Sequence, residues 1–451
     1  MNRLTSEEQL VPQPNVLFIF TDQQSANMLS CAGNRYLQTP AMDSIADGGM
    51  RFDRAYCTNP VCVPSRVSLM TGHMPGEFGI VANQDEPVPE EVVKNGLGTL
   101  LRQAGYRTAY AGKIHLPEDL HPTNIGFDYL TDDRREGLAE RCAQFIRQDH
   151  DRPWLLVSSF INPHDICFMA IRDCPSERQK SWLDPANAHM QRLNKALRMP
   201  EGVSEEEFYA EHCPPLPPNF EIQPEEPQII TESVRNSPFR NNARENWPPR
   251  RWRLHRWAYC QLTQMVDARI GVVLNALRKS GQADDTLVIF TSDHGDHDSA
   301  HRLEHKGTFY EEAIRIPLII RPPGGTADSH ATADHLVSNG LDLLPTICDY
   351  AGVDPPADLM GRSLRPLLTG GSVSAPHEHL PIECAHGRMV MTDRYKYMLY
   401  DEGDNREQLI DHENDPGDMH NIAGEPASKE LLEEHRSRLA KVFDYSHPGN
   451  A

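Results

Sequence analysis

The stretch of the chain best suited to chemistry is Cys-Val-Pro-Ser-Arg, residues 62–66. Pro64 prevents a regular helix from passing through Cys62, and it favours the first turn of a helix that starts just after it. Ser65 can cap that turn, and Arg66 brings a positive charge close to the sulfur. A thiol at a helix N-terminus beside a cation is stabilised as the thiolate. Cys62 is therefore either an activated nucleophile or a buried structural cysteine, which is the more common state of a lone cysteine.

A second group of polar residues follows an almost continuous apolar run at residues 15–21. The run predicts a buried parallel strand, and α/β sheets place their ligands at the carboxyl ends of such strands. Asp22 and Gln23 stand at that end. Carboxylate and amide oxygens side by side suit a hard divalent cation. Asp22 could equally well be a helix cap, so both interpretations stay open.

A third group follows a predicted strand at residues 286–291, where Asp293 and His294 are the first residues of an Asp- and His-rich segment. Carboxylate and imidazole side chains at a strand end indicate a metal site. Chance clustering is the alternative, because the chain contains 21 histidines.

A basic and aromatic patch lies within and just after residues 166–250, a segment rich in prolines and weak in periodicity. Its central residues are Arg250, Arg251, Trp252 and Arg253. Arginine side chains bind sulfate or carboxylate, and tryptophan faces stack on sugar rings, so the patch is a candidate substrate surface. The alternative is the solvated start of a helix with its tryptophans in the core, since Arg253 and Trp257 fit one helix face.

Several ordered motifs together resemble the sulfatase family. They are Cys-x-Pro-Ser-Arg followed by Thr-Gly, the segment AGYRTAYAGKIH at 104–115, Pro-His-Asp at 163–165, and TSDHG at 291–295 followed by KGTFYEEAIRIPLII at 306–320. The resemblance covers nearly the whole chain except residues 166–250. Many members carry Asn where this chain has His294, and Gln23 is the less common variant at its position.

The resemblance implies specific roles. Cys62 would be oxidised to formylglycine, whose hydrate is the nucleophile, and the modified residue would also contact the metal. Asp22, Gln23, Asp293 and His294 would hold one divalent cation, with calcium expected first and manganese or magnesium as alternatives. The residues expected around the sulfate are Arg66, Lys113, His115, His164, His301 and Lys306. His115 would be the base that releases sulfate, and His164 would assist the leaving group, although a His after a Pro can also merely cap a loop.

The implied activity is the hydrolysis of a sulfate ester, for which the patch favours a sulfated sugar over a small aryl or choline ester. A phosphonate monoester or phosphodiester hydrolase of the same superfamily is the first alternative, and a non-catalytic sulfated-glycan binding protein is the second. The implied partners are the sulfated substrate and a maturation enzyme, either formylglycine-generating or of the anaerobic sulfatase-maturating type.

Composition narrows the remaining possibilities. The chain has 451 residues with 44 Lys and Arg against 65 Asp and Glu, a net charge of −21. Nucleic-acid binding through bulk charge is therefore not expected. No apolar run is long enough to cross a bilayer. Residues 1–13 lack the apolar core of a signal peptide, so we expect a cytoplasmic protein, or a periplasmic or secreted one if a leader has been removed. The ten cysteines contain no Cys-x-x-Cys pair. The oligomeric state is left open by the sequence.

The elements that must position these residues follow from periodicity and from the resemblance. The family implies an alkaline-phosphatase-like α/β fold, with a large, mostly parallel mixed sheet flanked by helices. We expect a catalytic domain at 1–370, with the insertion at about 166–250, and a small C-terminal α+β domain at 377–451 after a linker at 370–376. Expected helices lie at 251–278, 335–350 and 428–443, and expected C-terminal strands at 389–392, 395–400 and 407–410.

Overall fold

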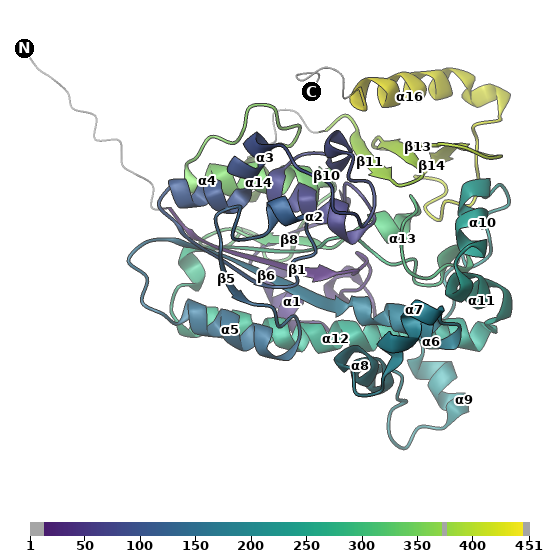
Figure 1. The fold of residues 1–451 in the computed structure, drawn as a ribbon, viewed down its shortest axis with the longest axis horizontal. Helices are drawn as coiled ribbons and strands as arrows, with labels where there is room; N and C mark the ends of the chain where they lie inside the picture. Colours follow the sequence, from purple (N-terminus) through teal and green to yellow (C-terminus); the bar gives the residue numbers. More distant parts are fainter. Residues whose placement is uncertain (1–12, 372–376, 445–451) are drawn as a thin grey trace, which may run out of the picture.

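A computed structural model describes residues 13–371 and 377–444. A mixed eight-stranded sheet forms its centre, with helices on both faces and a four-stranded sheet beside it (Figure 1). The order of the large sheet is β5-β4-β6-β1-β7-β8-β2-β9. Its strands are β1 (Asn15–Asp22), β2 (Met50–Phe52), β4 (Arg107–Gly112), β5 (Asp128–Thr131), β6 (Trp154–Pro163), β7 (Thr286–Ser292), β8 (Leu318–Arg321) and β9 (Ala331–Ala333).

Strand β1 is central and runs parallel to both of its neighbours. Val16 is in register with Leu155 of β6 and with Leu287 of β7. All residues of β6 and β7, and all but the first of β1, are buried, as expected for strands covered on both faces. The expected parallel strands are confirmed, and β8, which is antiparallel to β7, makes the sheet mixed. The carboxyl ends of β1, β6 and β7 consequently meet at one edge.

Two layers of helices cover the large sheet (Figure 1). One face carries α2 (Cys62–Thr71), α3 (Glu90–Lys94), α4 (Leu97–Gln103) and α14 (Asn339–Ala351). The other face carries α1 (Pro40–Ala46), α5 (Glu136–Ile146) and α12 (Pro249–Lys279).

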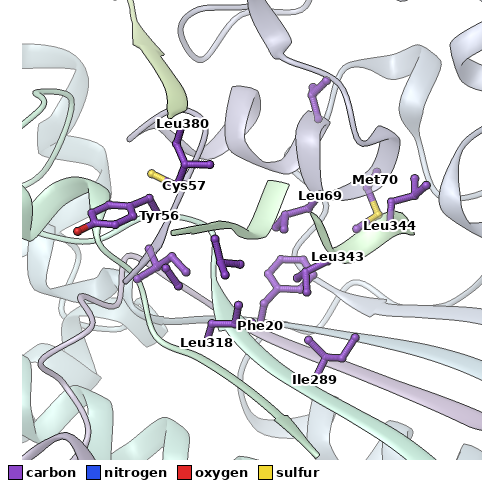
Figure 2. Close-up of a cluster of buried hydrophobic side chains, with 14 of the residues drawn as sticks. Phe20, Tyr56, Cys57, Leu69, Met70, Ile289, Leu318, Leu343, Leu344 and Leu380 are labelled. Atoms are coloured by element: carbon purple, nitrogen blue, oxygen red, sulfur yellow. The ribbon is translucent and has the colours of Figure 1, made fainter. Parts of the chain in front are cut away.

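The core between α2, α14 and the sheet is continuous with the C-terminal sheet. Figure 2 shows apolar side chains from all of these elements in one cluster, among them Phe20, Leu69, Leu344 and Leu380. Packing of this kind holds the helix that begins at Cys62 rigidly against the strand that ends at Asp22.

The insertion folds into short helices, as expected from its weak periodicity. They are α6 (Phe168–Asp173), α7 (Glu177–Lys180), α8 (Ala188–Ala196), α9 (Glu205–Glu207), α10 (Gln228–Arg235) and α11 (Pro238–Asn246). The long helix predicted at 251–278 is present as the 31-residue helix α12. No helix within the described residues is both long and apolar enough to cross a membrane.

The C-terminal segment forms an antiparallel sheet, β11 (Leu380–Cys384), β12 (Gly387–Met391), β13 (Tyr395–Tyr400) and β14 (Glu407–Asp411), with α16 (Lys429–Val442) packed on it. The three expected strands are confirmed, and β11 was missed. Most of the expected linker, residues 372–376, lies outside the described residues.

The start of helix α14 was predicted wrongly. The helix expected from residue 335 begins at Asn339, because Val337–Ser338 form β10, which pairs with β3 (Ala55–Tyr56). Two short helices, α13 (Glu311–Ile314) and α15 (Arg365–Leu368), complete the elements.

Candidate active site

Helix α2 begins at Cys62 itself, which corrects the expectation that it starts after Pro64. Proline is tolerated there because the first helical turn leaves its N–H groups unbonded. Ser65 does not cap the turn, and its hydroxyl donates instead to the backbone carbonyl of Asp293. The sulfur of Cys62 thus lies at the positive end of a helix, and Ser65 ties that helix to the loop after β7.

The Cys62 thiol is buried beside three ionisable side chains. Its Sγ lies 3.2 Å from His294 Nε2, 3.4 Å from Lys306 Nζ and 3.8 Å from Asp22 Oδ1. Burial and the Asp22 carboxylate both raise the pKa of this thiol, but Lys113, Lys306 and His294 outweigh them and the pKa lies well below its usual value. The interpretation of Cys62 as an inert structural cysteine does not fit this environment.

Arg66 holds the two acidic residues of the site together. Its Nη2 lies 2.8 Å from Asp22 Oδ2 and its Nε lies 2.8 Å from Asp293 Oδ2, and its side chain is 1% exposed. The Lys113 ammonium also donates to Asp22 Oδ2. Burial raises the pKa of Asp22, but Lys113, His164 and Arg66 reverse this effect, so the carboxyl titrates well below its usual range. These bonds leave Asp22 Oδ1 3.8 Å from Cys62 Sγ, while Asp293 Oδ1 accepts from the backbone N–H groups of Gln23 and His294 and lies 3.6 Å from His294 Nε2.

The donor atoms around Cys62 fit a divalent cation. His294 Nδ1 lies 2.8 Å from the Gly295 carbonyl, so this nitrogen carries a proton, and Nε2, which lies 3.6 Å from Asp293 Oδ1, is the nitrogen that binds a metal once it is deprotonated. Ligand atoms of Asp22, Cys62, Asp293 and His294 all lie within 4.8 Å of one another, and all four residues are buried. Carboxylate oxygens with one imidazole nitrogen are a donor set that divalent ions accept.

Gln23 completes this set of possible ligands. Its backbone lies in the left-handed region at φ 66°, which a non-glycine residue adopts only when its surroundings impose it. Its Oε1 accepts hydrogen bonds from Lys306 Nζ and from Cys167 Sγ, the latter at 3.1 Å. The amide oxygen therefore points toward the Lys306 and Cys62 side of the cluster.

The three predicted histidines occupy different surroundings. His164 follows β6 directly, and its pKa is held well below the usual value by burial and by Lys306. His115 lies two residues beyond Lys113, exposed, without a side-chain hydrogen bond among the described residues. His301 is not brought to Cys62. Its ring stacks on Tyr310 at 3.7 Å between centroids, and burial lowers its pKa to about 3.

The predicted substrate patch is held by contacts within the insertion. Arg250 pairs with a glutamate of α9 at 3.1 Å, and Arg251 pairs with the aspartate that ends α6 at 2.7 Å. Arg253 donates to backbone carbonyls of the preceding proline-rich loop. Trp252 is 1% exposed. The structure therefore does not bring these four residues to Cys62, and their role in substrate binding stays a prediction.

Sequence reasoning missed several residues that contact the site. Asp296, which accepts a hydrogen bond from Gln23 Nε2, lies two positions after His294, so its spacing offered a signal. Arg240 belongs to the basic and aromatic patch noted in the sequence, but its contact with Lys306 and the contact of Cys167 with Gln23 had no signal, because both depend on the fold of the insertion.

A family model described as "Sulfatase" matches residues 14–353. The chain belongs to the sulfatase family. It is therefore a sulfuric ester hydrolase, and its alkaline-phosphatase-like fold is the one expected. A second model, described as "N-sulphoglucosamine sulphohydrolase, C-terminal", matches residues 299–444 and includes the small antiparallel sheet.

Individual sulfatases resemble the chain over nearly its full length. A Δ4,5-hexuronate-2-O-sulfatase of Bacteroides thetaiotaomicron is 30% identical and covers 95% of this chain and 88% of its own length. An N-acetylglucosamine-6-O-sulfatase of the same organism is 27% identical, and the match covers 93% of this chain and 85% of that sulfatase. The solved structure of a 2-O GAG sulfatase has a TM-score of 0.77 at 29% identity and covers 94% of this chain and 91% of that one.

Proposed function

We propose that this sulfatase removes sulfate from a sulfated sugar and that its nucleophile is a formylglycine made from Cys62. One observation carries the proposal. The Cys62 Sγ lies at the first residue of α2, within 3.4 Å of both His294 Nε2 and Lys306 Nζ. After oxidation, oxygen atoms on the same carbon replace the sulfur, so the sulfur marks the position of the nucleophile. A hydrated aldehyde supplies one hydroxyl to attack sulfur and a second whose deprotonation releases sulfate.

Asp22, Gln23, Asp293 and His294 would hold one divalent cation beside this residue. The oxygen-rich set favours calcium, with manganese or magnesium as alternatives. When bound, the cation acts as a Lewis acid on a sulfate oxygen. Asp22 Oδ1, which neither Arg66 nor Lys113 engages, and His294 Nε2, which the contact of Nδ1 with the Gly295 carbonyl leaves available, support this assignment.

The cationic side chains of the site bind the remaining negative charge of the sulfate. Lys306 is positioned by Gln23 and Lys113 by Asp22, so both ammonium groups are fixed before substrate arrives. Arg66 keeps the acidic residues in place and adds positive charge beneath the nucleophile.

His164 would donate a proton or a hydrogen bond to the leaving oxygen. Burial and Lys306 keep its ring neutral in the free site, so the charge of the incoming sulfate must raise its pKa before it can act as an acid. His115, which is exposed beside Lys113, would take the proton of the second hydroxyl when sulfate is released.

The sugar component of the substrate rests on the relatives. Two of them are named as sulfatases of a hexuronate and of N-acetylglucosamine, and they match this chain over more than nine tenths of its length. We therefore propose a sulfated sugar in preference to a small aryl sulfate.

The test is to express the chain with a maturation enzyme and to determine residue 62 by mass spectrometry. The modified protein is then assayed on sulfated mono- and disaccharides and on phosphonate monoesters and phosphodiesters. We expect sulfate release that requires formylglycine, is abolished in Cys62→Ala, and is lost with chelator and restored by calcium. Faster turnover of the phosphorus esters, or full activity with an unmodified thiol, would overturn the proposal.

A further inference from the structure

One partly buried arginine near the start of α12 is held, within the described part of the chain, by only a single backbone carbonyl. Arg244 pairs with Glu226, Arg250 with Glu205, Arg251 with Asp173 and Arg256 with Asp298, while Arg253 donates to three backbone carbonyls. Arg240, on α11, donates only to the carbonyl of Lys306 among the described residues. Most of its five N–H donors thus have no protein acceptor, although its side chain is partly buried. Binding an anion stabilises a partly buried guanidinium whose remaining N–H donors have no other acceptor.

Arg240 stands close to the proposed nucleophile. The guanidinium contacts the main chain of Lys306, and the ammonium of the same lysine lies 3.4 Å from Cys62 Sγ. The space between Arg240 and Cys62 is consequently spanned by a single lysine side chain, which is similar in length to a sugar ring. A ring whose sulfate is held at Cys62 can present another substituent to Arg240.

His305 adds a second basic group at the same place. Its backbone is in the left-handed region at φ 67°, a costly conformation for histidine, and its ring lies 4.9 Å from that of Phe239 on α11. Its Nδ1 lies beside the Glu304 carboxylate, so its Nε2 donates to an anion only when the ring is protonated, a form that Glu304 and the incoming anion both favour. Burial lowers the pKa of His305, and the nearby cationic groups of Arg240 and Lys306 lower it further.

We propose that Arg240 and His305 bind a second anionic group, a carboxylate or a second sulfate, on the sugar that carries the scissile sulfate. This inference rests on the proposed function, because it needs the scissile sulfate to be at Cys62. The planar fork of an arginine matches the two oxygens of either anion. Glu304 would help by holding the His305 ring through Nδ1. Arg240 and His305 then make the enzyme selective for doubly anionic sugars over singly sulfated ones.

The experiment compares substrates that differ by one charge. The first pair is a sulfated hexuronate and the same sugar with its carboxyl reduced to hydroxymethyl, and the second is a disulfated hexosamine and its monosulfated counterpart. The singly charged reference is p-nitrophenyl sulfate. In Arg240→Gln we expect kcat/KM for the preferred doubly anionic substrate to fall roughly 10- to 100-fold, as for loss of a charged hydrogen bond. The singly charged compounds should change by about twofold or less.

Companion variants keep the test decisive. Arg240→Lys retains a point charge and should lose less than Arg240→Gln, and His305→Gln should lower selectivity in the same direction. Arg178→Gln removes an exposed arginine of α7 and should behave as wild type. Melting temperatures show whether each variant is folded, and if Arg240→Gln is not, the lysine and His305 variants supply the comparison.

The outcomes separate this inference from the proposed function. The substrate pair that shows the selectivity identifies the anion as carboxylate or sulfate. Equal losses on singly and doubly charged substrates, or no loss in any variant, overturn the role of Arg240 and His305. If the wild-type protein with verified formylglycine releases sulfate from none of the compounds, the proposed function itself has failed.

Discussion

At the scale of single residues, Gln23 shows how the site controls the orientation of a side-chain amide. Gln23 Nε2 donates to Asp296 Oδ2, and Gln23 Oε1 accepts from Lys306 Nζ and Cys167 Sγ. Both Gln23 and Asp296 are fully buried. Because an amide has its donor on one side and its acceptor on the other, the carboxylate decides which side faces the cluster at Cys62. Asp296 is thus a positioning residue for a proposed metal ligand.

Asp296→Asn tests this role. The new amide can donate to Gln23, which then turns its own NH₂ group toward the cation site. We expect the calcium dissociation constant to rise roughly 10- to 100-fold, as for other substitutions behind metal ligands. Isothermal titration calorimetry on protein with unmodified Cys62 measures this without relying on activity.

Two further variants complete the Asp296 test. Replacing Gln23 by Glu in the Asp296→Asn background restores a donor–acceptor pair and should recover part of the affinity. Asp328→Asn, at an exposed acid, should leave it unchanged. Calcium affinity equal to wild type in Asp296→Asn would show that the amide orientation is set by other contacts.

The sequence could predict the residues of the site that stand at the ends of regular elements. Asp22 and Asp293 follow apolar runs that become β1 and β7, and Cys62 precedes a helix. It could not predict the contacts that Arg240 and Cys167 make, because these depend on the path of an insertion that has no strong periodicity. Long-range hydrogen bonds of this kind have no local signature in a chain.

At the scale of elements, the position of α2 depends on its packing against α14. Figure 2 shows side chains of both helices in the same core cluster above the sheet. Gly340, in the first turn of α14, has no room for a side chain. A Cβ there would lie 2.6 Å from Ser68 Cβ on α2 and 2.8 Å from Thr58 Cγ2. A larger residue must therefore move the helix that begins at Cys62.

Gly340→Ala should accordingly lower both stability and activity. We expect a loss of about 1–3 kcal/mol, as for other overpacked sites, and a fall in kcat/KM on p-nitrophenyl sulfate, because α2 carries the nucleophile. Thermal denaturation and steady-state kinetics measure the two effects. Gly271→Ala in α12 is the matched control, since its Cβ would lie 3.4 Å from Ala41 Cβ, and it should be neutral or stabilising. A Gly340→Ala protein as stable and active as wild type would contradict the packing argument.

The start of α12 shows that one pattern of residues can have two explanations. Arg and Trp residues together are typical of sugar-binding sites, but here Trp252 and Trp257 are 1% and 8% exposed and pack into the insertion. Arg251 and Arg253 are bound to α6 and to the proline-rich loop. A long insertion needs a core of its own, and its large aromatic side chains are the groups that supply one. Amino-acid composition alone cannot distinguish aromatic residues that form such a core from those that form a binding surface.

At the scale of the whole molecule, a buried ion cluster joins the C-terminal sheet to the part of the chain that carries Lys306. Lys396, on β13, is fully buried, with its Nζ 3.1 Å from Glu311 Oε2 and 2.7 Å from Asp418 Oδ2. Glu311 is the first residue of α13, and its N–H donates to Asp418 Oδ2 at 2.9 Å. We retain the division into domains at 1–370 and 377–451 as a proposal. The cluster would then be the main polar link between the two domains.

Lys396→Met removes the cation that the two buried carboxylates share, which leaves Asp418 beside Glu311, whose Oε1 keeps the Arg315 Nε at 3.0 Å. We expect the free energy of unfolding to fall by about 3–5 kcal/mol at pH 8, the usual cost of an uncompensated buried charge. Burial raises the pKa of Glu311, but Lys396 reverses this and lowers it to about 2. Because the folded pKa is depressed, the stabilisation by Glu311 is present above the unfolded pKa near 4.5 and is lost as the pH falls toward 2. Without Lys396, burial and mutual repulsion raise the pKa of both carboxyl groups. Acidification therefore protonates them, which removes the repulsion and reduces the loss of stability in the variant.

The difference in melting temperature between wild type and Lys396→Met should therefore be large at pH 8 and smaller at pH 5. Lys429→Met, at the exposed start of α16, removes the same charge without touching the cluster and should match wild type at both pH values. A Lys396→Met defect that is absent, or that grows as the pH falls, would show that the carboxylates do not depend on this lysine. Loss of sulfate hydrolysis at temperatures where the variant remains folded would add that the C-terminal sheet positions Lys306 through α13, because the cluster connects the two directly.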